Sequence, residues 1–471
     1  MKPIIYLIAY VLIHIQVRGQ QNYELHNRVY DDMIKSVTFE ANNSPTGFPV
    51  IRLNEGQFIM LKFDDLLNEE RNFYYRIIHC DKDWSPSAMR EIDYINGFQD
   101  ERLRNYEYSV NTRIKFIHYW QQFPNKDFQF KISGNYVLYI YEDNAETPII
   151  TRRFIITESM AGIEMKSIFP SDVLNIRYKQ ELTANVSLGK LKPRNPMEEV
   201  TIGLIQNDNW DSEVIAKPSF LSSGVLRFTK LRTFDFWGLA EYREFDTRSL
   251  FRLGRGLEFI NRRVDGTDIT LQKDTSRANK VHLSIFDFNG RYFIDNADKY
   301  STGAYNDINE MLSASALTDA STRQTLRDSL LSSLSSNNRN FNTYHVEDRD
   351  VRSDYTEVNF LLDAPLVLEP KQDIYILGSM NNWQPSDEYK MKYDGKRDMY
   401  DAQVLLKQGY YNYYYGVVEE GKPIDYQALE GSWNETENDY RAFIYYRGLG
   451  DLYDRVIGYG AYNSNSNLLR N

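Results

Sequence analysis

Short alternations of apolar and polar residues run through residues 33–157 and predict a series of β-strands. Turn-forming pieces such as NNSPTGFP and DKDWSPS separate the alternations. The strand-like pieces read VIRL, QFIMLKF, FYYRIIHC, IKFIHYW, DFQFKIS, NYVLYIY and IITRRFIIT. About seven short strands in a segment of this length are typical of a β-sandwich. Residues 20–158 are therefore predicted to form an N-terminal β-sandwich.

The same pattern continues in two further stretches of the chain. In residues 159–298 the strand-like pieces include LTANVSLG, VTIGLIQN and GVLRFTK, which predict a middle β-rich domain. In residues 345–447 they include EVNFLLD, DIYILG, MYDAQVLL, YNYYYGVV and RAFIYYR, which predict a C-terminal domain. Residues 448–471 show no clear period and are predicted to be a tail. The predicted fold class is all-β, with tandem immunoglobulin-like sandwiches.

Residues 299–344 break this pattern. The segment loses its β-branched and aromatic residues, and Leu326, Leu330 and Leu334 recur at helical spacing. Many Ser and Asn residues surround them. Two interpretations stay open, an excursion with one or two short helices and a plain disordered loop. Either way, the segment is predicted to be an insertion between two β domains.

The first 19 residues, MKPIIYLIAYVLIHIQVRG, indicate an export signal. Lys2 supplies a positive start, residues 4–15 are apolar, and Val17-Arg18-Gly19 offers a cleavage site. The apolar run is shorter than the roughly 20 residues that span a bilayer. A buried first helix or an N-terminal anchor is the alternative. With the export signal, the mature protein is expected outside the inner membrane.

Composition supports a β-rich chain and excludes several partners. The 36 Tyr and 25 Phe residues favour pleated, half-buried surfaces. The net charge of −11 argues against nucleic acid and anionic lipid, because both would repel the chain. Cys80 is the only cysteine, so no internal disulfide can form. Neither nucleic-acid binding nor membrane insertion is expected.

Motifs that carry chemistry are missing from the sequence. It contains no His-Glu-x-x-His, no Gly-x-Ser-x-Gly, no phosphate loop and no dinucleotide glycine pattern. The piece HCDKDWSPS gathers His79, Cys80, Asp81, Asp83 and Trp84, but neighbours on a strand point to opposite faces. A strand end capped by turn carboxylates and Trp84 explains it better. No catalytic residue, cofactor site or metal site is predicted, and hydrolase activity is the weakest functional hypothesis.

An arginine-rich piece, EYREFDTRSLFRLGRGLEF, offers a candidate binding surface. Arg243, Arg248 and Arg252 alternate with acidic residues, and arginine forks suit bidentate contacts with carboxylates. A local lattice of salt bridges on a solvated strand is one interpretation. A docking patch for another protein is the other, and it makes these three arginines candidate partner-binding residues.

The C-terminal β segment resembles starch- and glycogen-binding modules of the early-set immunoglobulin type. The resemblance rests on DIYILGSMNNW, on MYDAQVLLKQGYYNYYYGVVEEG, and on the asparagine before RAFIYY. In those modules sugar rings stack on exposed aromatic side chains, so the resemblance makes Trp383 and Asn438 candidate glycan-binding residues. The chain departs from the modules in two places. A tyrosine near Tyr414 stands where they carry lysine, and no second tryptophan follows Gly421.

A wider resemblance covers nearly the whole mature chain. The pieces YYRIIHCDKDWSPSAMREIDYINGF and FPNKDFQFKISGNYVLYIYEDN, together with EYREFDTRSL, resemble the type IX secretion system plug proteins of Bacteroidetes. This resemblance implies a periplasmic, non-enzymatic protein without cofactors that occludes the periplasmic mouth of a large outer-membrane translocon barrel. The implied partner is that barrel, with the chain as a monomer within a hetero-complex. A periplasmic carbohydrate-binding protein is the alternative.

Overall fold

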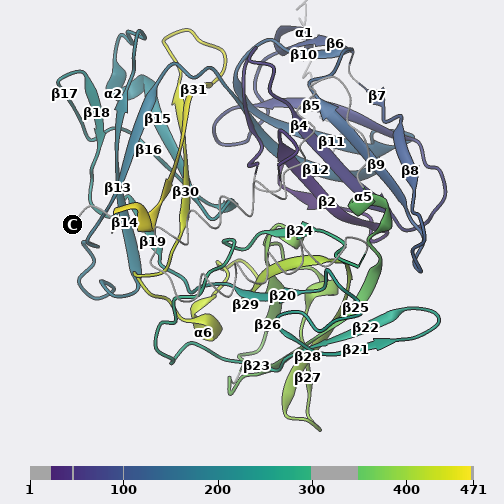
Figure 1. Ribbon diagram of the computed structural model, residues 1–471. Helices are drawn as coiled ribbons and strands as arrows, with labels where there is room; N and C mark the ends of the chain where they lie inside the picture. Colours follow the sequence, from purple (N-terminus) through teal and green to yellow (C-terminus); the bar gives the residue numbers. More distant parts are fainter. Residues whose placement is uncertain (1–22, 45–46, 99, 299–347, 367, 468–471) are drawn as a thin grey trace, which may run out of the picture.

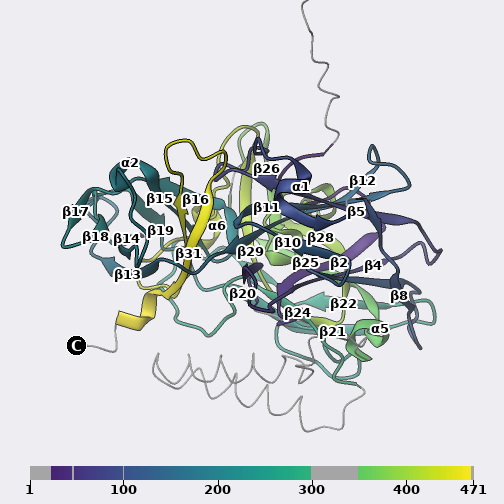
Figure 2. The ribbon, with the colours of Figure 1, turned by 90° about the horizontal axis from the view of Figure 1, so that it is seen from above.

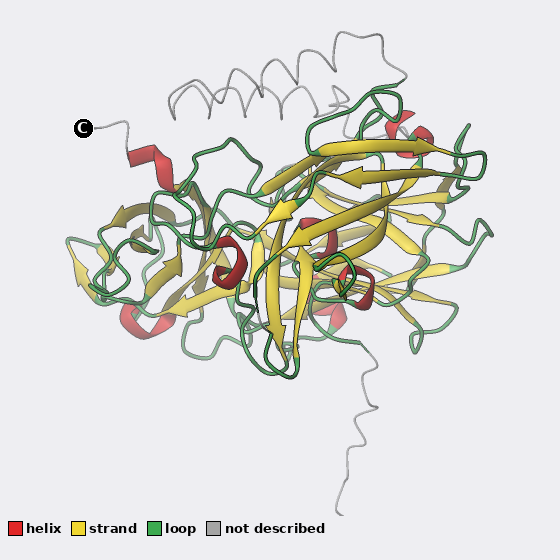
Figure 3. Cartoon of the chain, turned by 90° about the horizontal axis from the view of Figure 1, so that it is seen from below, coloured by secondary structure: helices red, strands yellow, loops and turns green. Residues whose placement is uncertain are grey.

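The computed structural model describes residues 23–44, 47–98, 100–298, 348–366 and 368–467. Strands dominate these residues, and the helices among them are short (Figure 3). The predicted all-β, sandwich-like fold is confirmed. The predicted export signal at residues 1–19 and the predicted insertion at residues 299–344 lie outside the described residues.

Two facing sheets form the N-terminal sandwich, at the upper right of Figure 1. The first has the order β1 (Arg28–Val29), β12 (Pro148–Thr157), β11 (Gly134–Glu142), β5 (Phe73–Cys80) and β7 (Glu101–Arg102), with β3 (Val50–Arg52) parallel to β12. The second has the order β2 (Ile34–Ala41), β4 (Ile59–Asp65), β9 (Ile117–Phe123) and β8 (Asn105–Tyr108). A ribbon of β6 (Ile95–Gly97) and β10 (Phe128–Phe130) lies beside α1 (Glu91–Tyr94). Leu61, Leu138 and Phe154 belong to the core between the sheets.

The middle sandwich, at the left of Figure 1, is built from two distant parts of the chain. One sheet contains β13 (Gly162–Ile168), β14 (Lys179–Ser187), β18 (Val225–Phe228), β17 (Phe220–Ser222) and β19 (Phe234–Trp237). The other has the order β16 (Asn209–Ala216), β15 (Val200–Gln206), β30 (Asp439–Tyr446) and β31 (Arg455–Asn463). The short helix α2 (Pro196–Glu199) precedes β15, and the 3₁₀ turn η3 (Ser464–Asn467) follows β31. Val186, Leu204 and Ile444 share the core between these sheets.

The third domain, at the bottom of Figure 1, is inserted between β19 and β30. Around β29 (Gly409–Glu419) lie β20 (Arg243–Asp246), β24 (Tyr292–Ile294) and β26 (Gln372–Leu377). The facing sheet contains β21 (Leu257–Arg262), β22 (Thr267–Leu271), β25 (Tyr355–Asp363), β28 (Met399–Lys407) and β27 (Lys392–Asp394), with β23 (Asp274–Thr275) paired to β25. The short helical pieces are α5 (Asp348–Arg352), η1 (Ser379–Asn381), η2 (Asp387–Tyr389) and α6 (Gln427–Glu430).

These sheets correct the domain segmentation that the sequence predicts. The predicted middle domain, residues 159–298, includes β20–β24, which belong to the third domain. The predicted C-terminal domain, residues 345–447, includes β30, which pairs along its whole length with β15. The predicted tail, residues 448–471, contains β31, which pairs with β30. Alternation of polar and apolar side chains identifies a strand but not the strand that pairs with it. The partner of β30 is β15, more than two hundred residues earlier in the chain.

The run YYNYYY at residues 410–415 is buried on both faces of β29. Tyr411, Tyr413 and Tyr415 point into the core of the third domain, whereas Tyr414 stacks on Tyr242 with ring centroids 3.7 Å apart. The hydroxyl groups of Tyr413 and Tyr415 donate to Asp274, at 2.7 and 2.9 Å. Each buried phenol therefore keeps a hydrogen bond while its ring fills the core.

Ending the chain at residue 454 tests the role of β31. Loss of β31 exposes the edge of β30 and removes Val456 and Ile457, which are both fully buried. Each of these two side chains contributes about 1.5–3 kcal/mol to the free energy of unfolding. We expect a lower melting temperature by differential scanning calorimetry, together with aggregation. A chain that ends at residue 467 keeps β31 and should melt like the full chain. Equal melting temperatures for the two truncations would contradict the assignment.

Candidate functional site

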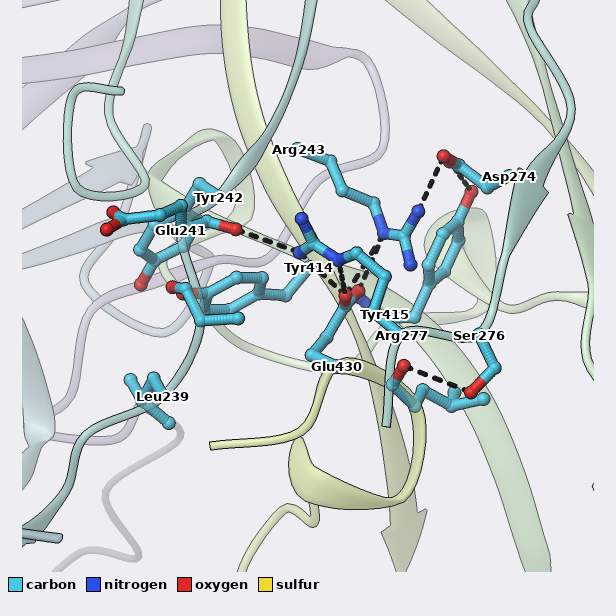
Figure 4. A network of polar contacts seen from close by, with 12 residues as sticks. Leu239, Glu241, Tyr242, Arg243, Asp274, Ser276, Arg277, Tyr414, Tyr415 and Glu430 are labelled. Atoms are coloured by element: carbon cyan, nitrogen blue, oxygen red, sulfur yellow. Dashed lines mark hydrogen bonds and ion pairs between the residues drawn. The ribbon is translucent and has the colours of Figure 1, made fainter. Parts of the chain in front are cut away.

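Arg243, the first predicted partner-binding residue, lies inside the third domain (Figure 4). Its Nε is 2.9 Å from Glu430 Oε1, and its Nη1 is 2.6 Å from Asp274 Oδ1. Nη2 donates to the carbonyl oxygen of Thr275 at 2.8 Å. The guanidinium group thus joins β20 to β23 and to the end of α6, and no part of it is offered to a partner.

Glu430 is the centre of this network. Besides Arg243, it accepts a hydrogen bond from Arg277 Nε at 2.8 Å and one from the backbone N–H of Tyr415 at 2.9 Å (Figure 4). Burial would raise the pKa of Glu430, but the two arginines bring it below its usual value. The carboxylate therefore stays charged and fastens α6 against β29.

Arg248, the second predicted partner-binding residue, is fully buried. Its Nε and Nη2 lie 2.9 and 2.6 Å from the two carboxylate oxygens of Asp246. The sequence left open a lattice of salt bridges and a docking patch. Arg243 and Arg248 form salt bridges, as in the first interpretation, but inside the protein and not on a solvated strand. Alternating charges indicate ion pairing, but they do not show whether the pairs lie inside the protein.

Arg252, the third predicted residue, is exposed, and apolar side chains flank it. Phe251 and Leu253 are 68% and 61% exposed. The guanidinium carbon of Arg262, on the edge strand β21, lies 4.5 Å from the ring centroid of Phe251. We call this surface, formed by Phe251, Arg252, Leu253 and Arg262, the Arg252 face. The β21–β22 hairpin that carries part of it extends from the edge of the third domain (Figure 1), and Arg113 of the N-terminal domain donates to the carbonyl oxygen of Gly266 in its turn at 2.8 Å.

Trp383 is buried, contrary to its predicted role as an exposed glycan platform. The preceding turn holds Trp383 in place, because the backbone N–H of Trp383 donates to the carbonyl oxygen of Gly378 at 2.9 Å. Asn381 closes the same turn by accepting from the N–H of Gly378 at 3.0 Å. A Cβ atom on Gly290 would lie 2.9 Å from the indole and 2.6 Å from the ring of Tyr242. Gly290 therefore covers part of the indole, and only 5% of Trp383 is exposed.

Asn438 lies in another domain from Trp383 and is fully buried. It precedes β30 in the middle sandwich, where its Nδ2 donates to the carbonyl oxygen of Gly238 at 2.8 Å. Its Oδ1 accepts from Asn207 at 2.7 Å. The two predicted glycan-binding residues therefore form no common exposed surface. The two residues were predicted to lie together because the predicted C-terminal domain, residues 345–447, includes β30.

A buried carboxylate joins the N-terminal domain to the third domain. Asp64 on β4 accepts from Lys407 Nζ at 2.5 Å and from the Tyr355 hydroxyl at 2.7 Å. Within its own domain it lies 2.7 Å from His118 Nδ1. Burial would raise the pKa of Asp64, but Lys407 and His118 lower it below its usual value. An acid within the apolar strand IMLKFDD was the available sequence signal, and sequence reasoning missed it.

The HCDKDW turn joins the N-terminal domain to the middle domain. Trp84 donates from Nε1 to Glu213 Oε2 at 3.0 Å, and its ring meets that of Trp210 edge-on at 4.9 Å. The backbone N–H of Lys82 donates to Asp454 at 3.1 Å. The turn thus has a structural role, as the sequence analysis favoured: it ends a strand, and Trp84 packs against the neighbouring domain. Burial also raises the pKa of the Cys80 thiol to about 12, which makes it a poor nucleophile.

The middle and third domains meet at Asp208. Its carboxylate accepts from Arg291 of the third domain at 2.7 Å and pairs with Arg441 of β30. The two arginines hold the pKa of Asp208 below its usual value despite its burial. All three domain pairs are thus joined by buried or half-buried polar contacts, and we call these contacts together the domain junction. Figure 2 shows from above how the three sandwiches pack around it.

The described part of the chain shows no group of three or more His, Cys, Asp or Glu side chains arranged to hold a metal ion. Nor does it contain a helix long and apolar enough to cross a membrane. The features that stand out in it are the domain junction and the Arg252 face.

Glu241, beside Arg243 in Figure 4, gives stability a pH dependence. Burial, with repulsion from Glu437, raises its pKa from 4.5 to about 8. The folded protein thus binds this proton more tightly than the unfolded chain, so stability is lost as pH rises from about 4.5 to 8. From pH 6.5 to 8.5 the loss through Glu241 is about 2 kcal/mol. Urea unfolding at both pH values should show a smaller loss in Glu241→Gln, and an identical loss would refute the assignment.

Comparison with known proteins gives a family match for the N-terminal domain and a similar solved structure for nearly the whole chain. Residues 34–158 match the family described as the type 9 secretion system plug protein 1st domain. No curated protein matches the chain. A crystal structure at 2.30 Å of a hypothetical protein from Parabacteroides merdae ATCC 43184 superposes with a TM-score of 0.79 at 25% sequence identity. It covers 94% of this chain and 100% of its own.

The family match covers the sandwich that contains β2–β12, including the HCDKDW turn that contacts the middle domain. The solved structure shows that the arrangement of all three domains recurs in a protein from Parabacteroides merdae. The resemblance of the third domain to early-set glycogen-binding modules stays a prediction. The N-terminal sandwich of this chain is thus similar to the first domain of type IX secretion system plug proteins.

Proposed function

We propose that the protein is a periplasmic plug of the type IX protein secretion system. In this role it occludes the periplasmic end of the large outer-membrane translocon barrel by non-covalent protein–protein binding. The observation that carries the proposal is the family match of the N-terminal sandwich. The role requires no catalysis and no cofactor, and the chain acts as a monomer within the hetero-complex.

The domain junction supports this role physically. A barrel wide enough for folded cargo leaks solutes when idle, so a closing element must be wide and must not deform. A domain of about 150 residues has a radius of gyration of about 15 Å, so three such domains held together span a wide opening. Asp64 and Asp208 hold two of the three domain pairs through buried charged hydrogen bonds. Buried pairs of this kind impose one geometry more than they add stability.

The Arg252 face is the proposed contact with the barrel. Reversible closure favours a few aromatic and arginine anchors within a polar surround over a broad apolar interface. Phe251 supplies an exposed aromatic ring, and Arg252 supplies a fork for carboxylates. Of the three predicted partner-binding arginines, Arg252 alone is exposed.

No structural observation favours the carbohydrate-binding alternative. Trp383 and Asn438 are 5% and 0% exposed, so a sugar ring has no platform to stack on at either residue. That alternative therefore rests on the sequence resemblance alone.

The test is affinity capture of the outer-membrane barrel from detergent extracts, with cross-links mapped on the chain. We expect the barrel to be recovered and the cross-links to cluster near Arg252. The double variant Phe251→Ser with Arg252→Glu should weaken binding at least about tenfold, because it removes an anchor and reverses a charge. Both residues are exposed, so the melting temperature should not change.

A matched control changes the same residue types on the N-terminal domain. Phe98 is 73% exposed and the Arg90 side chain is 79% exposed. Phe98→Ser with Arg90→Glu should bind the barrel like the wild type. Equal loss in both double variants would show that the Arg252 face is not the contact. Failure to recover any outer-membrane barrel with the wild type would refute the plug role itself.

A further inference from the structure

A pocket opens where the three domains meet. Its cavity volume is about 130 Å³, close to that of a cavity that holds a benzene ring. The N-terminal domain contributes Phe39 and Arg152, the middle domain contributes Trp210, and the third domain contributes Arg291 and Trp383. Aromatic side chains thus stand beside arginines in a space that touches every domain.

Arg152 is the unusual member of this lining. It lies in the middle of β12 and is 3% exposed. Its Nη1 donates to the carbonyl oxygens of Arg28 and Thr151, at 3.0 and 2.8 Å. Among the described residues no carboxylate lies within 4 Å of it, and its Nε and Nη2 make no hydrogen bond. Arg152 is thus a buried cation without a counter-charge.

Several other buried or half-buried arginines of the protein pair with a carboxylate. Arg243, Arg248 and Arg441 each hold a carboxylate directly. Burial lowers the pKa of Arg152 to about 10, and the neighbouring Tyr292 and Tyr30 offset this only in part. A buried charge without a partner is strongly unfavourable, so an anion from outside would relieve a cost that the protein already carries.

Arg153, the next residue of β12, adds positive charge to the same pocket. Its guanidinium carbon lies 4.5 Å from the ring centroid of Trp84, and its Nε donates to the carbonyl oxygen of Leu25 at 2.7 Å. It too has no carboxylate within 4 Å in the described part of the chain. Both arginines line the pocket, so Arg153 adds positive charge beside the Nε and Nη2 donors of Arg152.

We propose that this pocket binds a small organic monocarboxylate, with Arg152 as its anchor. The free Nε and Nη2 edge of a guanidinium matches the two oxygens of a carboxylate. Trp210 and Trp383 give the apolar part of the ligand an aromatic wall. Glu40, Asp208 and Asp211 also line the pocket, and their charges oppose a dianion such as phosphate more strongly than a monoanion. This site is independent of the proposed plug role.

The experiment titrates the full mature chain with sodium benzoate at constant ionic strength, by calorimetry and by thermal melting. Benzamide, its neutral counterpart of nearly equal shape, and inorganic phosphate are the comparison ligands. We expect saturable benzoate binding and, at about ten times its Kd, a melting temperature higher by about 2–4 °C. Benzamide and phosphate should bind at least about tenfold more weakly, because neither is a monoanion with an apolar part.

Two variants test the role of Arg152. Arg152→Gln removes the cation and should raise the Kd for benzoate at least about tenfold. Asn27→Asp places a carboxylate in the same pocket and should have the same effect by satisfying the arginines from within. The exposed-residue variant Arg90→Gln is the matched control and should bind like the wild type.

Three outcomes would overturn the proposal. Equal affinity for benzoate and benzamide would show that charge is not recognised. Phosphate binding tighter than benzoate would assign the site to a different anion. Unchanged benzoate affinity in Asn27→Asp or in a folded Arg152→Gln would make Arg152 purely structural. Should Arg152→Gln fail to fold, the wild-type comparison of benzoate with benzamide and the Asn27→Asp variant still decide the question.

Discussion

The pairing of β15 with β30 is the constraint on which the rest of the structure depends. It runs from Val200 opposite Tyr446 to Gln206 opposite Tyr440 and completes the second sheet of the middle sandwich. Because the third domain lies between β19 and β30 in the chain, both of its ends enter the middle domain. A domain attached by two chain crossings has far less freedom than one attached by a single linker. The overall rigidity of the protein therefore begins with this pairing.

Buried polar contacts convert that topological restraint into one defined geometry. Asp64 and Asp208 sit between domains and each meets a cation of another domain. Breaking such a pair from one side leaves a buried charge alone, which is costly, so the domains cannot slide past one another by small steps. Trp84 and Trp210 add apolar contact at the third interface. The three sandwiches are held as one body in this way.

Local properties of the fold could be predicted from the sequence, and long-range ones could not. The alternation in residues 33–157 predicted the N-terminal sandwich, whose strands β1–β12 lie within residues 20–158. The piece RAFIYY was predicted to be a strand, and it is β30, but nothing in its own residues shows that β15 is its partner. Arg243 and Arg248 were predicted as charged residues at a surface, and the structure places both inside the protein. Burial depends on what packs above a residue, and that is again a long-range property.

The protein is thus best understood as a rigid three-domain body with one arginine-bearing aromatic face turned outward. Solute flux through the purified translocon barrel in lipid vesicles tests the proposed plug role most directly. The account predicts that adding this chain stops the escape of entrapped fluorescent dextran at one chain per barrel, and that removing the chain restores it. Continued escape while the chain is bound would contradict the account, because binding would then occur without closure.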